Sequence, residues 1–307
     1  MAIFNTSSPL TRSAILLTLG ISIFGFADNL TLLVSEQVGV GQFHFSRSLC
    51  AIIFVLTFAY ISGVSLLPKN WKPILVRTSF NVVSMLLYFG VIPMMPIAEA
   101  GAGLFTSPIF ILLFSFVLYK EKITIRQIFS FILGLLGVFL ILGNNFSTLT
   151  LFHIFPVLAG ASYAMGAIVT NRYLQEEEPA AILLVFLISI GLVGLLLTFF
   201  FTLNPVDHDL LLQAPFIFKT WSNPGTFFWF IMIFLGFSSS LAIYCIIKAY
   251  QISKPSYAAI YEYTYLISAG FFSYIFWGIV PTFTSILGII AIVVAGTNII
   301  AAKVSKE

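Results

Sequence analysis

Ten apolar runs of about 20 residues follow one another along the chain, with little sequence between them. A helix needs about 20 residues to cross roughly 30 Å of hydrocarbon. Of the 307 residues, 60% are hydrophobic and 8% are charged, whereas soluble domains carry about 25% charged residues. Because charged side chains cover water-exposed surfaces, this composition excludes a soluble fold. We expect an all-α integral membrane protein with ten transmembrane helices, at 13–34, 43–66, 72–95, 97–119, 124–143, 151–174, 179–203, 226–250, 255–277 and 281–302.

The first run is interpreted as a helix that remains in the protein. It is longer than the apolar part of a secretion signal, which spans about 7–15 residues, and it contains Asp28. Basic residues then predict the orientation, because cytoplasmic loops carry an excess of Lys and Arg. With ten spans, 12 of the 14 basic residues fall on one side, Lys219 falls on the other, and Arg47 lies within a span. We expect a plasma (inner) membrane protein with both termini in the cytoplasm.

A weak internal repeat suggests two halves, residues 1–146 and 147–307. An offset of 158 residues aligns the fourth span with the ninth, so that Ala100 meets Ala258 and Thr106 meets Thr264. The identity is low, but both halves have a short helix pair, a short turn and a closing helix that contains glycine. Five spans in each half require opposite orientations in the membrane, and inverted repeats of this kind are typical of secondary transporters.

Several short motifs carry a resemblance to a known family. They are Phe45-Ser46-Arg47, Ala98-Glu99-Ala100, Phe105-Thr106-Ser107-Pro108 and Tyr119-Lys120-Glu121-Lys122 in the first half, and Ala249-Tyr250, Tyr261-Glu262-Tyr263-Thr264, Phe276-Trp277-Gly278 and Val280-Pro281-Thr282 in the second. In this order and spacing the chain resembles the drug/metabolite transporter superfamily, EamA type, over nearly its full length. The resemblance implies a ten-helix carrier, built of two inverted EamA-like repeats, for amino acids, nucleotide-like metabolites or drug-like solutes.

Two opposite charges lie at similar depth in the first two spans. Asp28 is about six residues from the outer end of the first span, and Arg47 is about five residues from the outer end of the second. Ionisable groups inside a span face a cavity or a partner, so we expect the two side chains to approach each other. Two interpretations are open. One is a structural ion pair, and the other is an Arg47 that binds an anionic group of a substrate while Asp28 is its resting partner.

Glu262 lies about seven residues into the ninth span and has no cation near it in sequence. Tyr265 follows at i+3, and Tyr261 belongs to an adjacent stripe of polar and aromatic residues. Removal from water disfavours the charged form of a carboxyl group. Three roles are open: a Glu that bonds tyrosine hydroxyls for packing, a contact for a substrate amine, or the carrier of a coupling proton.

Other polar residues in the spans are weaker candidates. Glu99 either starts a helix favourably, or contributes to an outer gate or to a contact with a substrate amine. Tyr88 and Tyr244 either join helices or line a cavity for aromatic or amphipathic solutes. Arg77 is expected to reach the cytoplasmic interface. The candidate substrate-binding or coupling residues are thus Asp28, Arg47, Glu99, Glu262, Tyr261, Tyr265, Tyr88 and Tyr244.

The remaining patterns exclude several classes of function. A net charge of +3 without a basic cluster does not indicate nucleic-acid binding. Cys50 and Cys245 lie in separate apolar runs, so neither a disulfide scaffold nor a Cys-ligated metal site is expected. No phosphate-binding loop or hydrolase motif occurs, so no enzyme and no cofactor is expected.

The sequence therefore predicts a secondary transporter that works by alternating access, with proton coupling open. Its expected partners are a small-molecule substrate and the lipid bilayer, and assembly as a homodimer is open. The alternative is a non-transporting membrane protein of the same fold, either lipid-binding or an accessory subunit.

Overall fold

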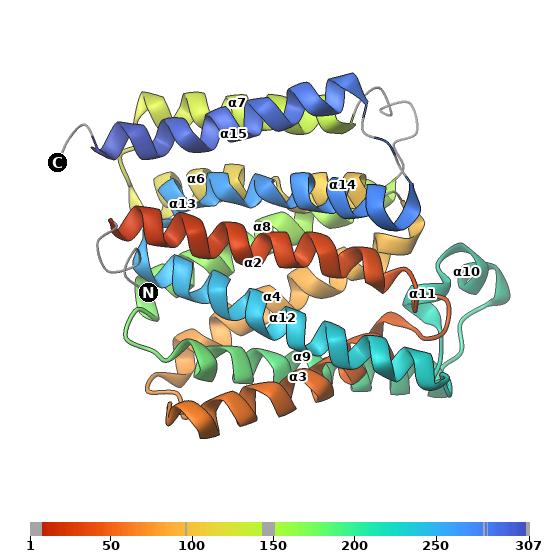
Figure 1. The fold of residues 1–307 in the computed structure, drawn as a ribbon. Helices are drawn as coiled ribbons and strands as arrows, with labels where there is room; N and C mark the ends of the chain where they lie inside the picture. Colours follow the sequence, from red (N-terminus) through yellow and green to blue (C-terminus); the bar gives the residue numbers. More distant parts are fainter. Residues whose placement is uncertain (1–7, 96, 143–150, 279, 281, 305–307) are drawn as a thin grey trace.

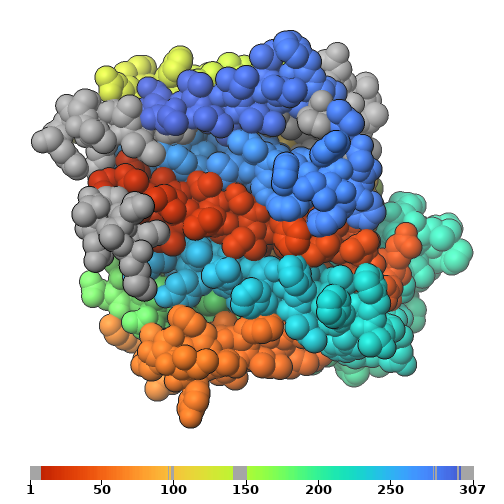
Figure 2. All heavy atoms as spheres, in the orientation of Figure 1, coloured from red at the N-terminus to blue at the C-terminus, as the bar shows by residue number. Residues whose placement is uncertain are grey.

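The computed structural model describes residues 8–304 except 96, 143–150, 279 and 281. Every regular element among the described residues is helical, and no strand occurs in them, which confirms the all-α prediction. The long helices run side by side across the molecule (Figure 1). In Figure 2, α15, α14, α2, α12 and α3 follow one another across the visible face, and their side chains fill the spaces between the ribbons.

The elements follow the predicted apolar runs closely. In chain order they are α2 (Pro9–Thr31), α3 (Val40–Ser62), α4 (Trp71–Val91), η1 (Ile92–Met94), α5 (Ile97–Leu104), α6 (Ser107–Tyr119), α7 (Ile125–Leu142), η3 (Leu151–His153), α8 (Ile154–Tyr173), α9 (Pro179–Leu203), α10 (His208–Gln213), α11 (Pro215–Phe218), α12 (Thr226–Ile252), α13 (Pro255–Ala258), η4 (Ala259–Tyr263), α14 (Thr264–Trp277) and α15 (Phe283–Val304).

Seven helical stretches among the described residues are long and apolar enough to cross a membrane. They correspond to the predicted spans one to four and six to eight. The apolar parts of α7 and α15 are shorter, and the predicted ninth span is divided among three elements. The molecule is thus an integral membrane protein by its helices, while ten spans remain a prediction.

Two of the predicted spans are discontinuous. The fourth breaks between α5 and α6, where the hydroxyl of Thr106 donates a 2.7 Å hydrogen bond to the carbonyl of Gly103. Pro108 follows directly, and proline cannot continue a helix from the preceding turn because it lacks an N–H group. The ninth span contains the 3₁₀ stretch η4, where the hydroxyl of Thr264 donates a 2.7 Å hydrogen bond to the carbonyl of Tyr261. In both, a threonine hydroxyl adds a hydrogen bond to a carbonyl that the backbone N–H of the same threonine also bonds.

The boundaries of these elements recur at the offset found in the sequence. The first residues of α5 and α13, 97 and 255, differ by 158, and so do the first residues of α7 and α15, 125 and 283. Lys120 ends α6 and Gly278 ends α14, again 158 apart, and both adopt left-handed backbone conformations with φ of 52° and 68°. The weak sequence match therefore coincides with a match in helix starts and helix caps.

Helix pairs pack in a matching pattern across the molecule. The most extensive contacts join α7 to α15, α3 to α9, α4 to α8 and α12 to α2. The α3–α9 contact depends on glycine, because a Cβ on Gly194 would lie 2.5 Å from the carbonyl oxygen of Gly41. Small residues let helix backbones approach closely within a membrane.

The basic residues of three loops mark one end of the bundle. Lys69 joins α3 to α4, Lys120 joins α6 to α7, and Lys254 joins α12 to α13. This end, at which α2 begins and α15 ends, is at the left in Figure 1 and is called the basic end below. Asp28 lies in the half of the bundle away from it, and Glu262 lies in the half nearer to it.

Candidate functional site

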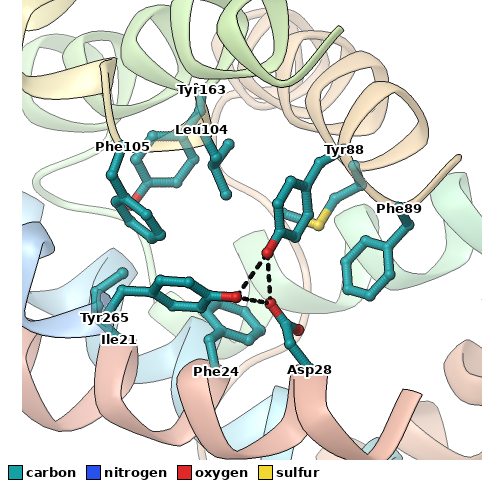
Figure 3. A pocket seen from close by; sticks show the side chains of 10 residues that line it. Ile21, Phe24, Asp28, Tyr88, Phe89, Leu104, Phe105, Tyr163 and Tyr265 are labelled. Carbon is teal, nitrogen blue, oxygen red and sulfur yellow. Dashed lines mark hydrogen bonds between the residues drawn. The ribbon is translucent and has the colours of Figure 1, made fainter. Parts of the chain in front are cut away.

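Asp28 lies at the centre of a buried polar cluster formed by three helices. Its Oδ2 atom accepts hydrogen bonds from the hydroxyl of Tyr88 on α4 at 2.8 Å and from that of Tyr265 on α14 at 2.7 Å. The two hydroxyl oxygens are 2.7 Å apart (Figure 3). All three side chains are at most 3% exposed. A carboxylate that accepts two hydroxyl hydrogen bonds is held in one position within the membrane.

A small cavity adjoins this cluster. Its volume is about 20 Å³, which is roughly the room for one water molecule. Figure 3 shows the side chains around it, with the polar groups of Asp28, Tyr88, Tyr163 and Tyr265 among apolar neighbours. Those neighbours are Ile21, Phe24, Met85, Phe89, Leu104 and Phe105. The cavity is thus lined mainly from α2, α4, α5, α8 and α14, and it includes groups that can bond both polar and aromatic parts of a solute.

Arg47 does not form the expected ion pair with Asp28. Its Nη2 donates to His44 Nδ1 at 3.1 Å, and its guanidinium carbon lies 5.2 Å and 4.8 Å from the ring centres of Phe43 and Phe89. The two charges still interact electrostatically. The direct contact is absent because tyrosine hydroxyls already bond Asp28, while the guanidinium group packs on aromatic rings, which attract cations.

Glu262 lies in a second buried cluster at the break of the ninth span. Its Oε2 accepts a 2.6 Å hydrogen bond from Ser107 at the start of α6, and its Oε1 accepts one from the hydroxyl of Tyr250 on α12. The Glu262 side chain is fully buried. The partners come from two other helices, so this carboxyl group joins three parts of the bundle.

Tyr163 on α8 borders both acidic clusters. It lines the cavity beside Asp28, and it also interacts electrostatically with Glu262. Its hydroxyl has no hydrogen-bond partner of acceptable geometry among the described residues. The same tyrosine therefore borders both the cavity beside Asp28 and the surroundings of Glu262.

The other predicted residues have different surroundings. Tyr265 bonds Asp28 and not Glu262, although it follows Glu262 at i+3. Tyr261 is buried in η4 beside Glu262 in the chain. Tyr244 lines a separate pocket of about 190 Å³ between α3, α9 and α12, so the structure does not bring it to either acid. Glu99 belongs to α5, but its side chain lies outside what the structure describes.

Sequence reasoning misses four residues of these clusters and their surroundings. Tyr250 and Ser107 bond Glu262, yet in the sequence they stand out only as parts of motifs. Tyr163 has the pattern of a contact between helices. Arg77, expected at the membrane interface, is only 4% exposed. Helix spacing alone cannot reveal them, because each meets its partners across different helices.

Comparison with known proteins finds a family match in the first half of the chain. Residues 11–143 match the EamA-like transporter family. The resemblance carried by the sequence motifs is thereby confirmed, and the match covers the region from α2 to α7 that contains Asp28, Arg47 and Ser107.

Named relatives extend the similarity over most of the chain. A pseudopaline exporter from Pseudomonas aeruginosa is 22% identical over 93% of this chain and 95% of its own. An S-adenosylmethionine uptake transporter from Rickettsia prowazekii is 22% identical over 88% of this chain and 84% of its own. A riboflavin transporter from Brucella anthropi is 26% identical, but the match spans only 53% of this chain and 52% of that protein. All three relatives are named as transporters or exporters of small molecules.

A solved crystal structure shows the same fold. It superposes with a TM-score of 0.76 over 95% of this chain and 96% of its own, at 14% sequence identity. At that identity the likeness concerns the fold alone.

Proposed function

We propose that the protein is a secondary transporter that carries a small organic metabolite across the membrane by alternating access. In this proposal the two halves, residues 1–146 and 147–307, are inverted five-helix repeats, and the substrate occupies the space between them. The chain lies in the plasma (inner) membrane with both termini in the cytoplasm. Movement of one half against the other opens the Asp28 cavity to each side in turn.

The observation that carries the proposal is the meeting of two broken helices beside buried acids. The break before α6 and the break in η4 are joined by the hydrogen bond from Ser107 to Glu262. Discontinuous helices near the membrane centre form the substrate and ion sites of many inverted-repeat transporters, because irregular backbone within a membrane must be enclosed by protein or line a cavity. Here the breaks flank the cavity that contains Asp28.

The recurrence of helix boundaries supports the inverted repeat. In the second element pair, α13 begins 158 residues after α5, and α14 begins 157 residues after α6. The packing of α4 on α8 has its counterpart in the packing of α12 on α2. This pattern is the one expected when the third helix of each half packs on the first helix of the other.

The cavity suggests the chemistry of the substrate. Asp28 can accept hydrogen bonds from an amine, and the surrounding aromatic rings favour a flat or amphipathic body. Arg47 lies close enough to contribute a positive field. Relatives are named for riboflavin, S-adenosylmethionine and pseudopaline, so these three compounds and their analogues form the first test panel.

The size of the cavity supports a closed form of the site, because about 20 Å³ is too small for such a metabolite. A transporter must therefore move its helices to admit substrate, and the breaks provide the places at which α5 and α14 can turn. The alternative of a non-transporting protein predicts that no such opening occurs and that no solute crosses.

The test begins with the purified full-length chain. A ligand that binds the folded state raises the melting temperature, so a metabolite panel can be screened before the substrate is identified. The best ligand is then measured for flux in proteoliposomes, with Asp28→Asn as the site variant and the exposed Glu176→Gln as the control. Flux that Asp28→Asn abolishes and Glu176→Gln preserves supports the proposal. Absence of flux for every ligand that binds contradicts it.

Orientation has its own test. A cysteine at Lys120 should react with a membrane-impermeant reagent only from the cytoplasmic side, and a cysteine at Lys219 only from the opposite side. The reverse labelling pattern would overturn the proposed topology.

A further inference from the structure

Arg77 is a buried cation in the part of α4 nearer the basic end. It lies two turns into the helix, and its side chain is only 4% exposed. Its guanidinium carbon lies 5.7 Å from the ring centre of Phe186 on α9. A long basic side chain near the end of a transmembrane helix ordinarily extends to the aqueous interface. The inward position of Arg77 therefore requires a different explanation.

Two donor atoms of the Arg77 guanidinium are buried without partners. Neither Nε nor Nη1 has a hydrogen-bond acceptor among the described residues. Arg172 and Arg47 differ in this respect, since the first forms an ion pair with Glu121 and the second donates to His44. A charged group buried without a counter-charge is costly, and such groups in transmembrane helices mark substrate or ion pathways.

The unpartnered atoms fit one kind of ligand. In the planar guanidinium, Nε and Nη1 lie on different edges and each forms a fork with Nη2, so either edge matches the two oxygens of a carboxylate. Phe186 covers the guanidinium group on one side, so the N–H groups remain available in the plane of the fork. The group therefore suits an oxyanion that the described part of the chain does not supply.

Arg77 also lies on a polar face that leads to the Asp28 cavity. Asn81, Ser84 and Tyr88 follow it on α4 at helical spacing, and the hydroxyl of Ser84 is buried with no partner among the described residues. Tyr88 ends this face with its hydrogen bond to Asp28. Tyr163, which lines the cavity, interacts electrostatically with Arg77. Two independent features thus connect Arg77 to the cavity.

We propose that Arg77 is a carboxylate-binding subsite on the translocation path, between the Asp28 cavity and the basic end. This inference rests on the proposed transport function and specifies its substrate as a metabolite with a carboxylate group. The substrate leaves Asp28 along the polar face of α4, and its carboxylate is received by the guanidinium of Arg77 before release. Arg47 provides the corresponding positive charge on the other side of the cavity.

The first experiment measures the stability of purified full-length variants. A residue kept for ligand binding is not needed for folding, so replacement of an unpaired buried cation by an apolar side chain of similar length should leave the melting temperature unchanged or raise it. We expect this result for Arg77→Met. A fall in melting temperature for Arg77→Met, with Arg77→Lys unchanged, would show a structural cation and overturn the proposal.

The second experiment measures anion binding with benzoate as the probe and neutral benzamide as its matched control. Benzoate should raise the melting temperature of the wild-type chain, and benzamide should not. Arg77→Met should weaken benzoate binding by roughly tenfold or more, Arg77→Lys should weaken it less, and the exposed, ion-paired Arg172→Met should leave it unchanged. Because Arg77→Lys keeps the charge but removes the fork, it separates the contribution of the fork to benzoate binding from that of the charge.

The outcomes separate this inference from the proposed function. Three results contradict the Arg77 subsite. The wild type does not bind benzoate, Arg77→Met still binds it as well as the wild type does, or binding is lost in Arg47→Met instead. Flux of a metabolite in proteoliposomes tests transport independently of benzoate. Flux without an Arg77 dependence would leave the transporter in place and remove the subsite.

Discussion

The hydroxyl of Ser107 donates a 2.6 Å hydrogen bond to Oε2 of Glu262, and this contact joins the breaks of two discontinuous helices. Ser107 is the first residue of α6, and Glu262 lies in the 3₁₀ stretch η4. The residues are 155 positions apart in the chain. A single buried hydrogen bond therefore ties together two distant parts of the chain where each has irregular backbone.

Removal of this contact should destabilise the closed form. Ser107→Ala leaves one oxygen of a buried carboxyl group without a donor, so the free energy of unfolding should fall by about 1–3 kcal/mol. Chemical or thermal unfolding in detergent measures the change. The exposed Ser79→Ala is the control, since its hydroxyl bonds a carbonyl of its own helix. Equal stability of the two variants would show that the Ser107 contact contributes little.

Glu262 is predicted to carry the coupling proton. Glu262→Gln keeps the size of the side chain and its capacity to accept from Ser107, but it cannot gain or lose a proton. We expect solute exchange to continue while stimulation by an imposed pH gradient disappears, because the driving ion no longer has a carrier. Flux measured with and without the gradient tests this, with the exposed Glu176→Gln as the matched control. Unchanged stimulation in Glu262→Gln would assign coupling elsewhere.

The helical class and most of the helix positions are predictable from the sequence because apolar runs of about 20 residues leave few alternatives. Asp28 and Glu262 are also predictable as candidates, since acids within such runs are rare. Their partners are not. The helix type changes between Glu262 and Tyr265, so helical spacing wrongly places their side chains together, whereas Tyr265 bonds Asp28.

Arg77 shows a second limit of sequence-based prediction. Extension to the interface is favourable for an arginine near a helix end, and the sequence offers no sign that this side chain turns inward. Only the packing of α4 against α8 and α9 reveals it. Contacts between residues far apart in the chain decide both the partners of the acids and the burial of this cation.

The two tyrosines of the Asp28 cluster should act together. Tyr88→Phe and Tyr265→Phe each keep the ring and remove one donor, so each should lower stability by about 1 kcal/mol. The double variant leaves the carboxylate without these donors. Its loss of unfolding free energy should differ from the sum of the two single losses, because the hydroxyls share one acceptor. A double-mutant cycle of unfolding free energies measures the coupling. The exposed Tyr60→Phe is the control, and strict additivity would argue against a shared network.

Transport should depend on the same cluster in a graded way. Asp28→Asn removes the negative charge but keeps a polar side chain, and we expect a greater loss of flux for it than for Tyr88→Phe. Initial rates of the best ligand in proteoliposomes compare the two, with protein incorporation measured in each case. A larger loss for Tyr88→Phe would indicate that the hydroxyl, and not the carboxylate, contacts the substrate.

Close packing of α3 on α9 provides the last prediction. A Cβ on Gly194 would lie 2.5 Å from the carbonyl oxygen of Gly41, and backbone atoms cannot move aside cheaply. Gly194→Ala should therefore lower stability by about 1–3 kcal/mol, as overpacking does elsewhere. Gly270 in α14 is the matched control, because a Cβ there meets nothing within 4 Å. Gly270→Ala should instead raise stability by up to about 1 kcal/mol, since alanine favours the helix. Opposite shifts in melting temperature are the expected result, and shifts of the same sign would show that α3 and α9 do not pack this closely.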